Sequence, residues 1–331
     1  MARKTLLPVS LSPRLLVSLS PCLPVSPSPC LPFSLSLLLL VSLSPCLPCS
    51  PQSCRAGELQ YPLSIAVADS GAIFIADRKL PGIWRLHDNK LLAFFTGSNQ
   101  LGTPLNAVRC VELDRDGRLL AGDSATRDIY RFDETGQPRP LTRRPTEDQT
   151  ASSAVNSGQV GIPVDIAVNH SGDIFVADLE IGRVVKLVND GRTDPQEIAR
   201  ISACRGLFID SQDNLWVVST TADQLHRISP NGDQEVIVPG LVFEFPHAVA
   251  VADNGTAYVC DGYAPAIWRV LPGLPPEKWV QGQPLINPVG LALYKDKLFI
   301  ADPHAKAIFQ IDAEGKLSKL EFGVQPPSPT R

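Results

Sequence analysis

A short apolar stretch that ends on an aspartate returns at nearly regular intervals through most of this chain. One copy runs from Ile174 to Asp178, and the cationic Lys186 follows its aspartate eight positions later. Equivalent stretches end at Asp77, Asp123, Asp261 and Asp302, whereas a sixth copy ends at Ser219. A fixed period of roughly 40 residues indicates a repeat architecture, in which each repeat is one supersecondary unit that packs on its neighbours.

Each repeat is predicted to contain four short strands. The first follows a proline or its equivalent and leads into a tight turn such as 69–71, where Asp, Ser and Gly suit the backbone of a turn. The aspartate-ended stretch is the second strand, and it is apolar on both faces, so both faces must be covered. Four antiparallel strands per repeat, stacked radially, predict an all-β fold, a six-bladed β-propeller of four-stranded antiparallel blades.

The predicted propeller domain covers residues 57–331. Its blades are expected at about 61–97, 105–143, 161–200, 201–240, 243–282 and 285–323. The outer strand of the last repeat is itself C-terminal. Closure of the ring is therefore expected to rely on packing of blade 6 against blade 1, with residues 58–60 as an additional edge.

Residues 1–56 have a different composition and form a low-complexity tail of Leu, Ser, Pro, Val and Cys. Closely spaced prolines exclude a continuous helix. The apolar run 33–43 is too short to span a bilayer but has the length of a signal-peptide core. If the tail is a signal, the protein is exported and is expected to be periplasmic, extracellular or membrane-anchored. Otherwise the tail is low-complexity sequence and the protein is cytoplasmic. No transmembrane span is expected.

Charge and cysteine content exclude some functions. The formal net charge is −4 and no Lys/Arg-rich run occurs, so a nucleic-acid partner is not expected. Cys110, Cys204 and Cys260 are an odd number of cysteines in three different repeats, where other repeats carry small residues. They are interpreted as buried small apolar side chains. Separately, the protein is expected to be a monomer.

The recurring aspartates are interpreted as structural, because five of six repeats carry one and five carry a cation eight residues later. Each is expected to bind amides of the loop that follows it and to pair with that cation across the hairpin. The predicted pairs are Asp77–Arg85, Asp123–Arg131, Asp178–Lys186 and Asp261–Arg269.

Residues just after the start of each first strand are expected to ring the channel mouth. They are Leu63, Arg109, Val164, Arg205, His247 and Val289. Two arginines and a histidine among them break the repeat, and together they predict a site for an anion or a carboxylate. Asp165, His304 and Tyr263 are expected on the same face. In the alternative interpretation, Arg109 and Arg205 only pair with Glu112, Asp165 or solvent.

The repeated Ile/Val-Ala-Asp with a later cation, as in Ile75-Ala76-Asp77 and Arg85, resembles the NHL-repeat six-bladed propellers. The resemblance covers about residues 58–323 and is looser toward the gluconolactonase/senescence-marker propellers. The NHL resemblance implies a non-catalytic binding or scaffold domain. Such a domain presents its channel-mouth face to a protein or a small anionic ligand, without a cofactor.

The looser resemblance implies a different function, a metal-dependent lactone hydrolase or lyase with one divalent cation in the channel. Such propellers hold the ion with acidic and amide side chains, which the six ring positions of this chain lack. His247 and His304, with Tyr263 nearby, offer only two nitrogen ligands. We therefore expect a binding domain without catalytic or metal-ligating residues, with the metal-dependent enzyme as the alternative.

Overall fold

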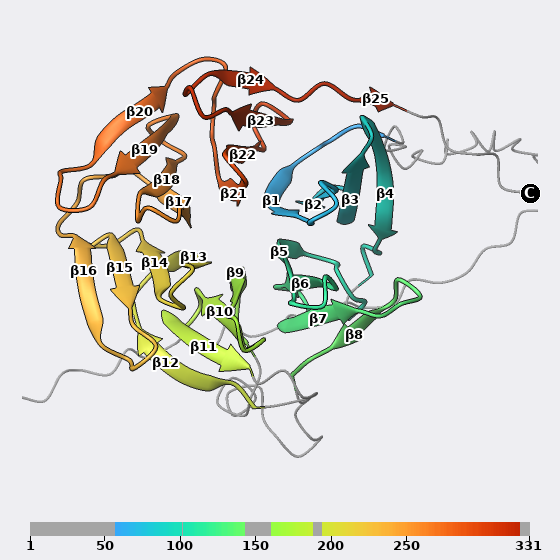
Figure 1. The fold of residues 1–331 in the computed structure, drawn as a ribbon. Coiled ribbons are helices and arrows are strands. Elements are labelled where there is room, and N and C mark those ends of the chain that lie inside the picture. The colour runs from blue at the N-terminus through green and yellow to red at the C-terminus, as the bar shows by residue number, and fades with distance from the viewer. Residues whose placement is uncertain (1–56, 101, 143–159, 188–193, 325–331) are drawn as a thin grey trace, which may run out of the picture. The chain divides into compact units, whose positions relative to one another are not determined.

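The computed structural model describes residues 57–100, 102–142, 160–187 and 194–324, and the structural statements below concern these residues. They form strands, turns and bends without a helix, and the strands make six sheets around a central axis (Figure 1). In every sheet the first four strands follow one another in chain order and pair antiparallel. The predicted six-bladed propeller of four-stranded antiparallel blades is confirmed.

The first three blades follow one another from the start of the described chain. Blade 1 contains β1 (Pro62–Val67), β2 (Ile73–Asp77), β3 (Gly82–His87) and β4 (Lys90–Thr96). Blade 2 contains β5 (Val108–Leu113), β6 (Leu119–Asp123), β7 (Asp128–Phe132) and β8 (Pro138–Pro140). Blade 3 contains β9 (Pro163–Val168), β10 (Ile174–Asp178), β11 (Arg183–Leu187) and β12 (Gln196–Arg200).

The other three blades complete the ring. Blade 4 contains β13 (Cys204–Ile209), β14 (Leu215–Ser219), β15 (Leu225–Ile228) and β16 (Gln234–Val238). Blade 5 contains β17 (Pro246–Val251), β18 (Ala257–Asp261), β19 (Ala266–Val270) and β20 (Glu277–Gln281). Blade 6 contains β21 (Gly290–Tyr294), β22 (Lys297–Asp302), β23 (Ala307–Ile311) and β24 (Leu317–Lys319).

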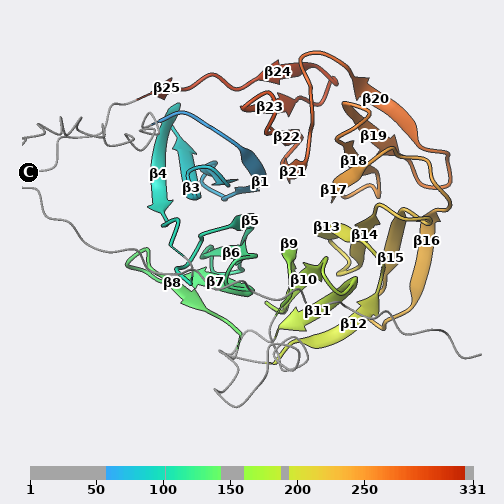
Figure 2. The ribbon, with the colours of Figure 1, turned by 180° about the vertical axis from the view of Figure 1, so that it is seen from behind.

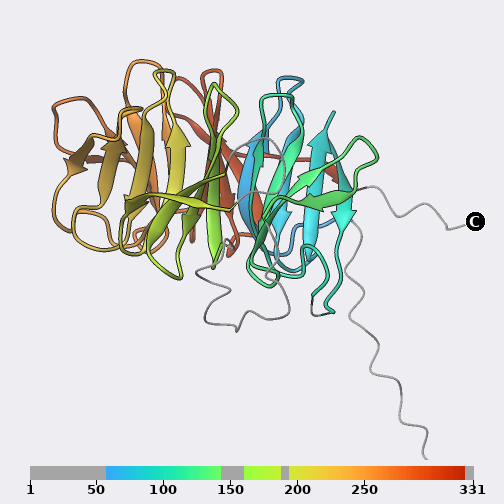
Figure 3. The same ribbon diagram turned by 90° about the horizontal axis from the view of Figure 1, so that it is seen from below.

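The first strand of each blade lies innermost, and neighbouring first strands contact one another around the channel (Figure 2). The blades stand side by side when the ring is viewed along its edge (Figure 3). The core lies between them, since each apolar cluster draws its side chains from adjoining blades. One such cluster joins Trp216 of blade 4 to Val249 and Trp268 of blade 5. This packing explains why the second strands are apolar on both faces.

The ring closes through the C-terminal end of the described chain. After blade 6, β25 (Gly323–Val324) pairs in parallel with β4 and adds a fifth strand to blade 1. Residues 58–60, one of the two predicted closing elements, form no strand, although Leu59 is buried in the cluster that blades 1 and 6 share. The other prediction, direct packing of blade 6 on blade 1, matches this cluster, and the Tyr294 hydroxyl also donates to the carbonyl of Asp69 at 2.8 Å.

The predicted tail 1–56 lies outside the described residues, so its role as a signal peptide stays a prediction. Among the described residues, no helix is long and apolar enough to cross a membrane. Cys110, Cys204 and Cys260 are buried and form no disulfide, as predicted from their counterparts in the other repeats.

The repeated aspartates are fully buried and bind amides on two sides, which confirms one half of their predicted role. The Asp261 carboxylate accepts hydrogen bonds from the amides of Glu244 (2.7 Å) and Phe245 (2.8 Å), which lead into the blade. It also accepts bonds from the amide of Ala264 (3.3 Å) and the indole of Trp268 (3.1 Å), in the turn and strand that follow. One carboxylate therefore joins the connection that enters a blade to the turn after its second strand.

The other half of the prediction is wrong, because the register separates each aspartate from its cation. Asp123 lies opposite Asp128, and Arg131 lies opposite Leu120, three residues further along the strand. Side chains alternate between the two faces of a sheet, so an offset of three residues places the acid and the cation on opposite faces. The pairs Asp77–Arg85, Asp123–Arg131, Asp178–Lys186 and Asp261–Arg269 are all excluded by the same register.

Three of the four cations instead pair with acids in the turn before the second strand or on the outer strand. Arg131 contacts Asp114 at 2.9 Å, Lys186 contacts Asp173 at 2.6 Å, and Arg269 contacts Glu277 at 2.6 Å. Among the repeated acids, Asp178 has an arginine partner at 3.1 Å, but that partner is Arg183, five residues later.

We expect Asp178→Ala to lower the free energy of unfolding by about 3 kcal/mol, since it leaves the amides of Gly161 and Ile162 without an acceptor and removes the buried carboxylate that pairs with Arg183. Urea denaturation of the full chain measures this. As a control, Asp253→Ala in an exposed turn should cost less than about 0.5 kcal/mol. Equal stability of the two variants would contradict the structural role.

Candidate functional site

The six predicted ring residues do meet at the mouth of the channel. Leu63, Arg109, Val164, Arg205, His247 and Val289 all line one cavity of about 180 Å³. In blades 1 to 5 the register skips the ring residue, for example between Pro246 and Ala248, so that the residue is an extra one in its strand. A β-bulge of this kind re-aims a side chain, which explains why these residues face the mouth.

Three arginines share this cavity. Arg109 and Arg205 come from the inner strands β5 and β13, and Arg78 comes from the turn after β2. The Arg109 Nε donates to the hydroxyl of Ser124 at 3.2 Å, and the Arg205 guanidinium lies 4.7 Å from the centre of the Phe245 ring. Within the described part of the chain, none of the three guanidinium groups forms an ion pair with a carboxylate, and the buried Nε of Arg205 has no hydrogen-bond partner. The mouth is therefore rich in unpaired donors.

The electrostatics of the mouth reflect this excess of positive charge. Burial and the neighbouring Arg78 lower the pKa of Arg109, and burial and Arg109 lower the pKa of Arg205. Burial together with Arg205 lowers the pKa of His247 to about 4, so its imidazole is neutral at pH 7. His247 therefore adds hydrogen-bonding capacity to the predicted anion site rather than a third charge. A bound anion would relieve the repulsion between the arginines.

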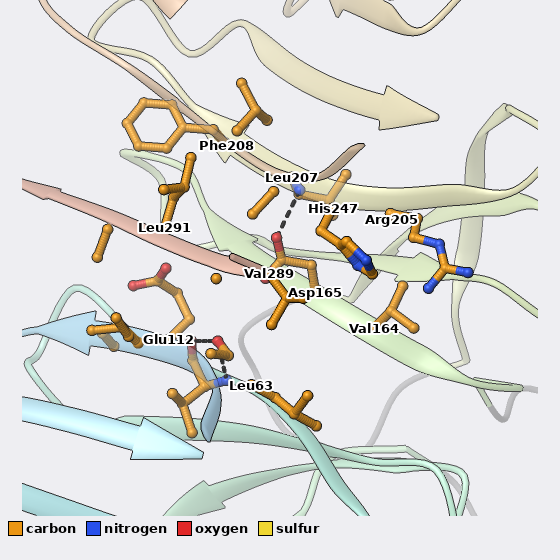
Figure 4. A pocket seen from close by; sticks show the side chains of 18 of the residues that line it. Leu63, Glu112, Val164, Asp165, Arg205, Leu207, Phe208, His247, Val289 and Leu291 are labelled. Carbon is orange, nitrogen blue, oxygen red and sulfur yellow. Dashed lines mark hydrogen bonds between the residues drawn. The ribbon is translucent and has the colours of Figure 1, made fainter. Parts of the chain in front are cut away.

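The other predicted site residues are distributed around this mouth. Tyr263 is 66% exposed at the rim and stacks on Phe245, with ring centres 4.5 Å apart. His304 is also exposed at the rim, and its ring centre lies 6.3 Å from that of Tyr61, which lines the cavity. Asp165 does not line the mouth cavity and instead faces a deeper cavity of about 150 Å³ in the channel (Figure 4).

Asp165 serves as a link between blades. Its carboxylate accepts a hydrogen bond of 2.8 Å from the amide of Leu207 in blade 4 and one of 3.0 Å from its neighbour Ile166. The equivalent Ser64 exchanges bonds with Val111 of blade 2, donating to its carbonyl at 3.4 Å and accepting from its amide at 3.1 Å. The alternative in which Asp165 or Glu112 neutralises the arginines is not observed among the described residues.

Sequence reasoning missed three residues of this region as site candidates. Tyr61 and Asn287 line the mouth, and the Asn287 amide donates to the carbonyl of Gly262 at 3.1 Å. Glu112 faces the deeper cavity from β5 (Figure 4). A signal for Glu112 was present, because the aligned positions of four other blades hold Ala66, Ala167, Ala250 and Ala292.

The deeper cavity favours protonated carboxyl groups. Burial, with repulsion from Asp165, raises the pKa of Glu112 to about 8 despite a hydrogen bond from the amide of Leu113. Burial also raises the pKa of Asp165 to about 7. Near neutral pH these groups can hold protons beneath the cationic mouth.

The mouth does not fit a divalent cation. Its ring residues supply arginines, aliphatic side chains and one imidazole, whereas a hard cation requires several oxygen ligands. Among the described residues, no group of three or more His, Cys, Asp or Glu side chains is placed to hold a metal ion.

We expect Glu112→Gln to make stability less dependent on pH. The ordinary pKa of 4.5 rises to about 8 in the fold, so between these values the folded state holds a proton that the unfolded state has released. This contribution to stability is present below pH 4.5 and is lost as the pH rises toward 8. The variant should therefore be more stable than the parent at pH 8 by at least about 1 kcal/mol.

Urea denaturation between pH 5 and 8.5 measures this difference. In the variant, the free energy of unfolding should depend less steeply on pH than in the parent. Some dependence should remain, because the pKa of Asp165 is also raised and Asp165 is present in both proteins. Parallel pH profiles for parent and variant would show that Glu112 is not protonated in the folded state.

Comparisons with known proteins support the fold of this chain but do not identify a specific function. No protein-family model matches the chain. Two curated relatives from Xenopus laevis, peptidyl-glycine alpha-amidating monooxygenases B and A, are 28% identical over 139 residues and 29% over 143 residues. The matches cover 38% of this chain and only 16% and 15% of those proteins.

Solved structures match over most of the propeller. Virginiamycin B lyase from Staphylococcus aureus has a TM-score of 0.57 and 19% identity, over 80% of this chain and 86% of that one. A gluconolactonase from Xanthomonas campestris has a TM-score of 0.61 and 14% identity, over 80% and 88%. A chain of a nidogen/laminin complex has a TM-score of 0.58 and 18% identity, over 77% and 91%. The chain thus shares its six-bladed propeller fold both with enzymes and with a propeller found in a protein–protein complex.

Proposed function

We propose that this propeller is a non-catalytic binding domain that captures a carboxylate, or a similar small anion, at the channel mouth. The observation that carries the proposal is the buried Nε–H of Arg205, which has no acceptor among the described residues, in a mouth that also holds Arg78 and Arg109, neither of which forms an ion pair there. A buried donor without a partner costs about 1–3 kcal/mol, and a bound carboxylate supplies the missing acceptor.

The chemistry of the mouth suits this ligand. A guanidinium group binds a carboxylate through two parallel hydrogen bonds, which fixes the orientation of the ligand as well as attracting its charge. Asn287, Tyr61 and the neutral His247 line the same cavity and add hydrogen-bonding groups. The volume of about 180 Å³ is below that of a site for a whole drug-sized ligand, so the buried part of the ligand is small.

We also propose that the domain is of the NHL-repeat type, with a protein or a small acid as the bearer of the anion. The recurring aspartate motif and the partial match to the amidating monooxygenases support this assignment. From the sequence alone, we further propose that the protein is exported and that it is a monomer.

A second candidate function, hydrolysis or elimination on a lactone-like ligand, is favoured by one observation. Glu112 and Asp165 have pKa values near neutrality below the mouth, as general acids and bases require. The divalent cation of the corresponding sequence prediction does not fit the mouth residues. If the parent protein turns over a lactone and Glu112→Gln does not, this function would be favoured over simple binding.

We expect propionate to bind the full chain and its uncharged analogue propionamide not to bind. Arg205→Met removes the buried donor and one charge, so it should weaken propionate binding at least about tenfold. A ligand-observed NMR titration measures such weak affinities.

Arg139→Met is the matched control, because Arg139 is an exposed arginine that pairs with Asp133 in blade 2 away from the mouth. It should leave the affinity for propionate unchanged. Equal binding of propionate and propionamide, or full binding by Arg205→Met, would refute a carboxylate site at the mouth.

A further inference from the structure

Exposed apolar side chains occur on the channel-mouth face at blades 5 and 6. Of the seven exposed large apolar side chains among the described residues, four lie in the connections that lead into or turn within these blades on this face, namely Leu241, Val242, Tyr263 and Ile286. Tyr263 stacks on Phe245 at an interplanar angle of 16°, and we call these two rings the aromatic step. With one face on Phe245 and 66% of its surface exposed, the Tyr263 ring offers its other face to solvent.

The aromatic step begins at the cationic mouth itself. The Phe245 ring lies 4.7 Å from the Arg205 guanidinium and 5.0 Å from the ring of His247, both of which line the mouth cavity. The Phe245 ring in turn lies 4.5 Å from that of Tyr263. Two short contacts therefore lead from the unpaired donor of Arg205 out to an exposed aromatic face.

The step is held rigidly before any ligand arrives. The buried Asp261 carboxylate binds the amides of Glu244 and Phe245 on one side and that of Ala264 on the other, so one side chain fixes both segments that carry the rings. The Gly262 amide also donates to the carbonyl of Phe245 at 3.1 Å. Rigid aromatic side chains bind at a low cost in conformational entropy.

Gly262 lets two mouth side chains pack closely over the backbone beside the step. A Cβ atom at this position would lie 2.8 Å from the Asn287 amide nitrogen and 3.1 Å from the His247 ring. A larger residue would displace these side chains, so the glycine preserves their positions between the mouth and the aromatic step.

From this juxtaposition we propose that the ligand is an aryl carboxylate, bound with its carboxylate at Arg205 and Arg109 and its aromatic ring against the exposed side of the aromatic step. The inference rests on the proposed carboxylate site and deepens it. Because the Phe245 ring lies 4.7 Å from the Arg205 guanidinium, a short spacer between carboxylate and ring lets the ligand reach the step. The same chemistry occurs in a free aromatic acid and at a peptide C-terminus that ends in an aromatic residue.

The test compares propionate, 3-phenylpropionate and 2-phenylethanol on the full chain by ligand-observed NMR titration. Stacking on an exposed aromatic face should make 3-phenylpropionate bind about 3- to 10-fold more tightly than propionate. 2-Phenylethanol, which has the ring without the carboxylate, should not bind measurably.

Tyr263→Ala should abolish the gain from the phenyl ring and leave the affinity for propionate unchanged, and Tyr263→Phe should retain the gain. The matched control is Leu274→Ala, which removes another exposed apolar side chain, in the connection from β19 to β20, and should change neither affinity.

The outcomes separate the two proposals. If neither acid binds, the carboxylate site fails and the aryl preference falls with it. If both acids bind equally, or if the gain survives Tyr263→Ala, the aryl preference is overturned while the carboxylate site stands. A tetrapeptide Gly-Gly-Gly-Phe that binds more tightly than 3-phenylpropionate would identify a peptide terminus as the source of the ligand, and weaker binding a free acid.

Discussion

Five of the six blades depend on the hydrogen bonds of a buried carboxylate at the end of the second strand. In five blades it accepts hydrogen bonds from the connection that enters the blade, and in each of them also from the turn or strand that follows its own strand, as Asp302 does with Ile286, Asn287, His304 and Ala305. Buried amides require acceptors, and here one short side chain serves both segments. Because those segments form the channel-mouth face, the same bonds that stabilise the blade also position its candidate ligand-binding side chains.

Blade 4 has a neutral side chain in place of this carboxylate. Ser219 accepts a hydrogen bond of 3.0 Å from the amide of Thr221 and donates one of 2.7 Å to the carbonyl of Ser202. The connection that leaves this blade is held by the buried Gln224, whose side-chain oxygen accepts from the amides of Val242 and Phe243. Ser219 therefore still joins the entering connection to the following turn, by donating to a carbonyl of that connection.

The period of the repeat was enough to predict the fold, because alternation and turn chemistry are local properties of a sequence. The ring of mouth residues was also predictable, since topology alone brings the starts of the six inner strands together. The acid–cation pairs were not, because contact across a hairpin depends on register, and the cation eight residues after Asp123 lies opposite Leu120. The burial of Glu112 and the stacking of Tyr263 on Phe245 depend on neighbours that no local pattern predicts. For Glu112, the only signal in the sequence was that it breaks the repeat.

We infer that the repeated residues stabilise the fold and propose that the residues that break the repeat bind the ligand. The mouth combines unpaired arginines, a neutral imidazole and an aromatic step that a repeated aspartate holds in place. A crystal structure of the full chain grown with bromide, located by its anomalous scattering, would test this assignment most directly. We expect a bromide ion in contact with the Nε of Arg205 at the channel mouth. A mouth without bromide, with a carboxylate of the chain itself bound to Arg205, would contradict it.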